Sequence, residues 1–184
     1  NMPYVLSCSF DSTQGVYQLF VQKFNGTSWV NHGTQIAANP NDYYSLDIDK
    51  LTNTVYVSYG SQSNYQASVV KVTSTGTTSL VGSAEFTASA VGSFYPTVRV
   101  DKTGNPYLIA QDDDTHERLS LYSFNGTSWS KAGGARFSKG HSYAPSLVFD
   151  KNNRPVVVFT DATYNTLGSV MQKNASGTWS FVGD

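Results

Sequence analysis

The sequence predicts an all-β fold, and the composition, an internal repeat and the turn residues all point to it. The 184 residues include 24 Ser, 18 Thr and 12 Tyr but only 2 Glu. Strands and turns favour Thr, Tyr, Ser, Asn and Gly, whereas long helices favour Ala, Glu, Lys and Leu. The composition therefore favours short strands joined by turns.

An internal repeat with a period of about 50 residues gives the fold class. The hexapeptide Phe24–Trp29 recurs letter for letter at Phe124–Trp129, and a degenerate copy lies at Gly177–Trp179. A second unit interleaves with the first at Ser45–Asp49, Thr97–Asp101 and Ser146–Asp150. Tandem units of four short antiparallel strands at this spacing are typical of β-propeller blades.

Each unit is expected to hold four strands, A to D in chain order. In the last unit the sequence predicts them at Pro145–Asp150, Pro155–Thr160, Ser169–Lys173 and Thr178–Val182. Asp side chains hydrogen-bond to nearby backbone N–H groups in turns, so Asp49, Asp101 and Asp150 are expected to fix the A–B turns. Asn-Gly at 25–26 and 125–126 is the favoured pair for a two-residue C–D hairpin.

The units divide the chain into a single propeller domain of four blades, at about 1–43, 44–94, 95–143 and 144–184. The first blade is expected to lack strand A, because Met2-Pro3 aligns with Asn105-Pro106 inside an A–B hairpin. Since the apolar faces of a blade must stack on neighbours, two arrangements are open. The chain is either a small four-bladed propeller or part of a larger ring, completed by further sequence or by another copy. We favour the second.

Charge and cysteine content exclude several classes of protein. The formal net charge is −1, which is incompatible with the basic surface of a nucleic-acid-binding protein. No apolar stretch approaches the roughly 18 residues of a membrane-spanning helix. The single cysteine, Cys8, excludes an internal disulfide and a cysteine-based zinc site. The hydroxyl-rich, lysine-poor composition is common on secreted proteins, so we expect a secreted or cell-surface location.

The repeat also carries a resemblance to a known group of proteins. The units Tyr95–Gly133 and Ala144–Gly183, with their Gly-Thr-Ser-Trp or Gly-Thr-Trp hairpin, resemble a repeat found in secreted bacterial β-propeller proteins. The hairpin is also loosely similar to a degenerate Asp-box of sialidase-type propellers. The resemblance implies the fold and secretion, whereas function must be argued from the site.

We expect ligands to bind at the rim formed by the B–C and D–A loops, because these loops are long and varied on a rigid scaffold. The densest polar run is Asp112–Arg118, with Asp112, Asp113 and His116 as candidate ligand contacts. Asp161 aligns with Asp112 at the end of strand B. Oxygen donors suit sugar hydroxyls or Ca²⁺, and the alternative is a solvated turn. Three further candidates on this rim are His141, Tyr143 and Tyr164.

Three tryptophans begin strand D at equivalent positions, namely Trp29, Trp129 and Trp179. They are candidates for stacking against sugar rings in repeated sites, which gives avidity. The alternative is that they pack between blades.

Together these features favour a non-enzymatic, lectin-like propeller that binds carbohydrate, with no cofactor other than Ca²⁺ at the polar run. One alternative is a protein-interaction or structural module of a larger surface protein. A second is a glycoside hydrolase or sialidase-like enzyme. It is disfavoured because such enzymes need two convergent carboxylates, and most of the 11 Asp lie at turns of the opposite rim. A homo-oligomer that completes the propeller is also expected.

Overall fold

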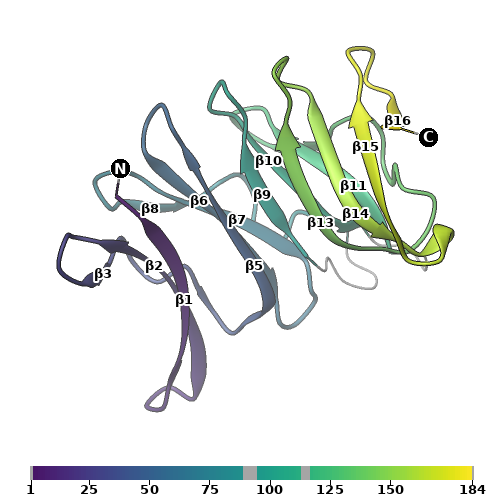
Figure 1. The fold of residues 1–184 in the computed structure, drawn as a ribbon. Helices are drawn as coiled ribbons and strands as arrows, with labels where there is room; N and C mark the ends of the chain where they lie inside the picture. The colour runs from purple at the N-terminus through teal and green to yellow at the C-terminus, as the bar shows by residue number, and fades with distance from the viewer. Residues whose placement is uncertain (1, 89–94, 113–116, 184) are drawn as a thin grey trace.

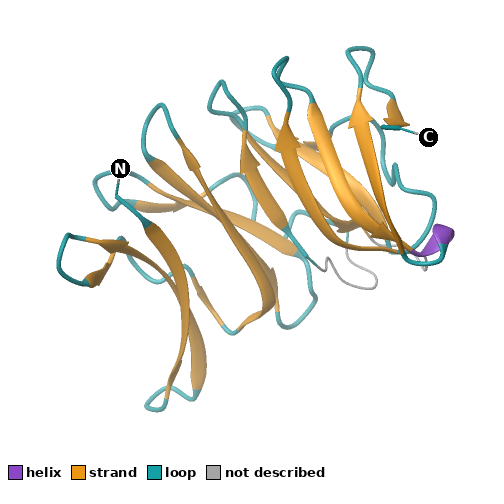
Figure 2. Cartoon of the chain, in the orientation of Figure 1, coloured by secondary structure: helices purple, strands orange, loops and turns teal. Residues whose placement is uncertain are grey.

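The computed structural model describes residues 2–88, 95–112 and 117–183, and it contains four antiparallel sheets. The sheets follow one another along an arc, with the first and the last at opposite ends (Figure 1). Apart from the short 3₁₀ turn Ala162–Tyr164, the regular elements of this part are strands (Figure 2). The predicted all-β propeller of four blades is confirmed.

The first blade contains β1 (Tyr4–Asp11), β2 (Val16–Phe24), β3 (Trp29–Asn31) and β4 (Ala37–Ala38); the second contains β5 (Pro40–Asp49), β6 (Thr54–Ser61), β7 (Ala67–Val72) and β8 (Thr78–Leu80). The third contains β9 (Thr97–Val100), β10 (Pro106–Asp112), β11 (Arg118–Phe124) and β12 (Trp129–Lys131). The fourth contains β13 (Ser142–Phe149), β14 (Pro155–Asp161), β15 (Leu167–Lys173) and β16 (Trp179–Phe181).

The last three sheets place strands A to D side by side in chain order, for example β5-β6-β7-β8. The first sheet runs β1-β2-β3, with β4 also paired to β2. It begins with strand B, as the alignment of Pro3 predicts, so β1 forms its inner edge. Strand A of the second blade starts at Pro40, before the expected boundary near residue 44, because the strand continues through a shift in register between Pro40 and Tyr44.

The A–B turns confirm the role predicted for their aspartates. Oδ1 of Asp49 accepts a hydrogen bond from the N–H of Leu51 at 2.9 Å. Oδ1 of Asp101 accepts from Thr103 at 2.8 Å and from Asn105 at 2.9 Å. Oδ1 of Asp150 accepts from Asn152 and Arg154, both at 2.8 Å. Each carboxylate thus replaces backbone partners that the tight turn cannot supply.

The C–D hairpins differ from the two-residue turn expected at Asn-Gly. Strand pairing ends at Phe24 and Trp29, so four residues connect the strands. Only Gly26 has positive φ there, whereas a two-residue type I′ turn needs it at both central residues. Oδ1 of Asn25 instead accepts from Thr27 and Ser28, both at 2.9 Å. The same geometry recurs at Asn125.

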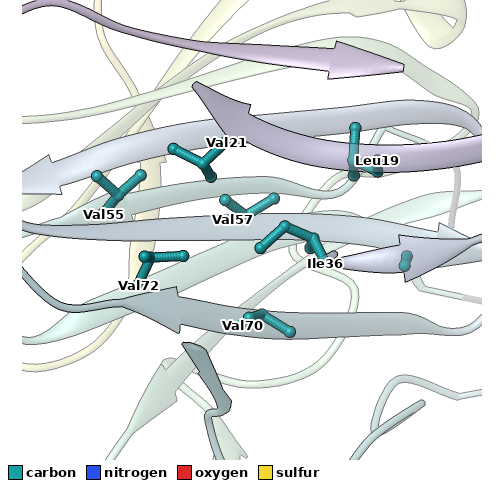
Figure 3. Packing of buried hydrophobic residues seen from close by; sticks show 8 residues of the cluster. Leu19, Val21, Ile36, Val55, Val57, Val70 and Val72 are labelled. Carbon is teal, nitrogen blue, oxygen red and sulfur yellow. The ribbon is translucent and has the colours of Figure 1, made fainter. Parts of the chain in front are cut away.

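The hydrophobic core is distributed between successive blades. Leu19 and Val21 of the first blade pack against Val55, Val57 and Val72 of the second (Figure 3). Two further clusters join the second blade to the third and the third to the fourth. Every internal core is therefore shared by two sheets, as the repeat requires.

Within the described residues, no helix is long and apolar enough to cross a membrane.

Candidate functional site

A cleft of about 660 Å³ lies between the first and second blades, on the rim of the B–C loops and D–A connections. One wall is the tip of the β1–β2 hairpin. The other comes from the connection into β5 and from the B–C turn of the second blade. The lining residues are Cys8, Phe10, Gly15, Tyr17, Asn39, Pro40, Asn41, Asp42, Tyr44 and Gln62.

The hairpin wall presents two aromatic rings to solvent. Asp11 fixes the turn by accepting hydrogen bonds from the N–H groups of Thr13 and Gln14 at 2.9 and 3.2 Å. β1 and β2 therefore stay paired out to the turn, and Phe10 lies directly opposite Tyr17. The two ring centroids are 5.2 Å apart with a tilt of 58°. Their exposures of 57% and 55% are high for aromatic residues, and they leave a surface on which a ring-shaped ligand can stack.

The opposite wall supplies amides. Asn39 has a φ of 45°, and its Oδ1 accepts from the N–H of Tyr17 at 2.9 Å, which ties the two walls together. Oδ1 of Asn41 accepts from Tyr43 at 3.0 Å. Nδ2 of Asn41 is buried and has no hydrogen-bond partner in the described part of the chain. A Cβ atom on Gly60 would overlap this amide, so the Asn41 side chain packs against β6.

The charge in the cleft is negative. Asp42 is the one carboxylate among the lining residues, and no Lys, Arg or His lines the cleft. Burial, followed by the charge of Asp42, raises the pKa of the Cys8 thiol. Burial, then Cys8 and Asp42, raise the pKa of the Tyr44 hydroxyl, which stays a neutral donor. The cleft therefore disfavours anions and favours a neutral ligand that can donate hydrogen bonds to a carboxylate.

The structure places the predicted residues His141 and Tyr143 elsewhere, on the rim between the third and fourth blades. Nδ1 of His141 lies 3.1 Å from Oε2 of Glu117 and 3.2 Å from the hydroxyl of Tyr143. Gln111 donates from Nε2 to the carbonyl of Ser142 at 2.8 Å. These groups hydrogen-bond to one another and link the two blades.

Asp161 and Tyr164 lie in the neighbouring loop of the fourth blade. Asp161 is fully buried, and its Oδ1 accepts from the N–H of Thr163 at 2.9 Å, which begins the 3₁₀ turn. The hydroxyl of Tyr164 lies 3.2 Å from Nζ of Lys139, and its ring packs on Phe181 at 5.8 Å. Asp161 thus stabilises a turn, whereas Tyr164 lies against the outer face of the last blade.

Two of the three tryptophans, Trp129 and Trp179, pack between blades, as in the alternative considered above. Trp129 stacks on Phe86 with centroids 4.7 Å apart, and its indole N–H donates to the carbonyl of Val81 at 2.7 Å. Trp179 stacks on Phe137 at 3.9 Å. Trp29 is 46% exposed and packs on Phe24 of its own blade.

The remaining candidates fall largely outside the described residues. Asp113 and His116 are not described, and of Asp112 only the backbone is, paired with Arg118 at the end of β10. Elsewhere in the described chain, no group of three His, Cys, Asp or Glu side chains could hold a metal ion. The Ca²⁺ site suggested for this run therefore stays a prediction.

Comparison with known proteins identifies the fold and nothing finer. No family model and no curated protein matches the chain. Among solved structures it is similar to the Aleuria aurantia lectin, solved with Fucα1-6GlcNAc, with a TM-score of 0.64 and 12% identity over 99% of this chain and 56% of that one. The chain thus spans just over half the length of that lectin.

Two enzymes show a weaker likeness. For an endo-1,4-β-xylanase from Bacteroides thetaiotaomicron the TM-score is 0.51, with 12% identity over 97% of this chain and 75% of that one. For fructan 1-exohydrolase IIa from Cichorium intybus, solved with 1-kestose, it is 0.51, with 14% identity over 97% and 44%. At such identities the likeness shows a propeller-like arrangement of four-stranded antiparallel sheets and nothing about activity.

The sequence did not indicate the cleft between the first two blades. Phe10 and Tyr17 flank the first B–C turn, but this segment contains no run of charged residues and no histidine, so it does not stand out as a binding site. Asn41 and Tyr44 lie in a connection whose residues do not repeat. The feature of the sequence that could have indicated the cleft is the pair of aromatic residues on either side of this turn, where a strand end is open to solvent.

Proposed function

We propose that the protein is a non-enzymatic, carbohydrate-binding propeller and that the cleft between its first two blades binds a neutral sugar. The observation that carries this proposal is the exposed pair Phe10 and Tyr17 in a cleft that the carboxylate of Asp42 also lines. Sugar rings offer apolar C–H faces for stacking and hydroxyls for hydrogen bonds. The cleft offers a partner to each.

Two further facts support sugars as the ligand class. The fold is similar to that of the Aleuria aurantia lectin, which was solved with a fucose-containing disaccharide. The absence of Lys and Arg from the lining argues against sialic acids and phosphates, whose charge needs a cationic partner. A secreted or cell-surface location is part of the proposal, because such ligands are displayed there.

A hydrolase in this cleft is less favoured. Retaining and inverting glycosidases need two carboxyl groups on either side of the scissile bond. Asp42 is the single carboxylate among the lining residues, and both oxygens of nearby Asp11 accept hydrogen bonds within the β1–β2 hairpin. We therefore expect bound glycans to be recovered intact after long incubation.

The first test is a glycan array followed by calorimetry with the best neutral monosaccharide. Tyr17→Ala removes half of the aromatic surface, so its affinity should fall on the order of tenfold or more, as is usual for an aromatic anchor. Tyr164→Ala removes a ring in a B–C loop of the fourth blade that is 41% exposed, against 55% for Tyr17, and it should leave the affinity unchanged. Loss with Tyr164→Ala and retention with Tyr17→Ala would move the site to the fourth blade.

The single cysteine allows an independent test. Cys8 lines the cleft, so a bound sugar should slow its alkylation, measured by mass spectrometry near pH 8.5 to offset the raised pKa of the thiol. If the sugar concentration that half-protects Cys8 from alkylation matches the dissociation constant from calorimetry, the sugar binds in the cleft. Binding on the array without protection of Cys8 would contradict it.

Unchanged binding in EDTA would remove the proposed role of Ca²⁺.

A further inference from the structure

A second hollow, of about 280 Å³, lies where the inner strands of the second, third and fourth blades begin. These strands, β5, β9 and β13, are neighbours in space (Figure 1). The described residues that line the hollow all belong to the starts of these strands or to the two residues before β9. We call this hollow the inner pocket.

The inner pocket and the cleft between the first two blades meet at β5. Asp42 and Tyr44 line both hollows. Tyr43, which lies between them in the chain, packs toward the third blade, where its ring centroid is 4.4 Å from that of Tyr95. The cleft lies on the side of the first blade and the inner pocket on the side of the third. A ligand in the cleft therefore has a path across β5 into the inner pocket.

Asp42 differs from the other aspartates in its hydrogen bonding. Six other aspartates with described side chains each accept a hydrogen bond from a backbone N–H, namely Asp11, Asp47, Asp49, Asp101, Asp150 and Asp161. Asp42 is exposed and accepts none from the described part of the chain. An ionised carboxylate has about four acceptor positions, so Asp42 can accept hydroxyl groups from ligands in both hollows.

The far wall of the inner pocket is held in a fixed shape. Tyr95 and Ala144 occupy equivalent positions in successive blades, each directly before a proline, and their φ values are 56° and 46°. Such a backbone is unfavourable for residues other than glycine, so it persists only where the surroundings fix it. The hydroxyl of Ser58 donates to the carbonyl of Pro96 at 2.6 Å. A wall that is already ordered lowers the entropic cost of binding.

The chemistry of the inner pocket matches that of the cleft. The rings of Tyr43 and Tyr95 and two prolines supply apolar surface, and Asp42 supplies the charge. A hydrogen bond with the hydroxyl of Tyr43, followed by burial, raises the pKa of Tyr95, so this phenol stays neutral. None of the described lining residues is Lys, Arg or His. The inner pocket thus disfavours anions and suits a second neutral sugar ring.

We propose that the protein binds a neutral oligosaccharide, with one sugar in the cleft, the next in the inner pocket, and the carboxylate of Asp42 accepting hydroxyl groups from both. This inference rests on the proposed function, because it takes the cleft as the first sugar site. Two linked sugars are favoured over two separate ones, since the second contact is then intramolecular and costs less entropy.

The test is calorimetry with the tightest-binding neutral disaccharide of the array and with its two sugars as methyl glycosides. The disaccharide should bind on the order of tenfold more tightly than the better glycoside, as a second aromatic contact allows. Tyr95→Ala should remove this gain and leave the affinity for the glycoside unchanged. The backbone tolerates alanine there, because Ala144 has the same conformation at the equivalent position.

Tyr65→Ala is the matched control. Tyr65 also has a left-handed backbone, with a φ of 58°, and it is not among the described residues that line either hollow. The variant should therefore leave both affinities unchanged. Asp42→Ala should lower both, because the carboxylate serves both sugars. Circular dichroism of each variant checks that it folds.

The outcomes separate this inference from the proposed function. A glycoside that binds in the cleft, with no gain for the disaccharide or with a gain that survives Tyr95→Ala, would overturn the inference and leave the proposed function intact. A disaccharide weakened by Tyr95→Ala but not by Tyr17→Ala would also overturn it, because the sugars would then not span both hollows. Absence of binding to every neutral glycan of the array would remove the proposed function and the inference together.

Discussion

Single aspartates at the A–B turns show how one side chain holds this fold. Asp101 is buried, and its two oxygens accept hydrogen bonds from Thr103, Asn105 and, in the next blade, Asn153. Burial alone would raise the pKa of Asp101, but the hydrogen bonds from Asn105, Thr103 and Asn153 outweigh it, so the pKa lies below its ordinary value. The carboxylate thus stabilises its own turn and the contact between blades.

Asp101→Ala should lower the free energy of unfolding by about 1–3 kcal/mol at pH 7, since several buried donors lose their acceptor. Because the pKa is lower in the folded state, this contribution is present above the unfolded value of about 4 and is lost as the pH falls through the folded value. Urea unfolding between pH 7 and 3 measures the difference from wild type. A difference that stays constant down to pH 3 would contradict the role of the carboxylate.

At the scale of elements, the three equivalent tryptophans have different surroundings. Trp129 and Trp179 are enclosed by the preceding blade, whereas Trp29 has no described blade before it. The repeat makes the local sequences nearly identical, so position in the array alone sets how much apolar surface each indole buries.

Trp129→Ala should cost about 3–5 kcal/mol, the usual range when a large buried aromatic is removed. Trp29→Ala should cost less than about 1 kcal/mol, as for a substitution at an exposed site. Both are measured by urea denaturation at high dilution, where association between chains does not contribute. Equal costs would mean that the two tryptophans lie in equivalent environments even in the monomer.

The strands and the missing first strand could be predicted because they follow from a pattern repeated along the chain. The Asp turns were predicted for the same reason, since their hydrogen bonds are local. The cleft was not, because Phe10 and Tyr17 meet Asn41 and Tyr44 only after two blades stack. Alignment placed Asp161 at the end of strand B, but that it is buried and that its Oδ1 accepts the N–H of Thr163 depend on the folded loop.

For the whole molecule, stacking in an arc makes stability depend on position. The second and third blades are covered on both faces, by clusters that include Val57 and Leu108. The first and last blades each have a core on one face only, and Val5 and Val158 lie exposed on the other. In arrays where each unit contacts only its neighbours, stability is a sum of unit and interface terms, so the end blades lack one interface each.

Amide hydrogen exchange at high dilution should therefore be on the order of tenfold or more faster in β1, β2, β14 and β15 than in β6, β7, β10 and β11, because the end blades open locally at lower free energy. Peptide-level mass spectrometry resolves these strands. Uniform exchange along the array would contradict this prediction and would mean that the chain unfolds as one cooperative unit.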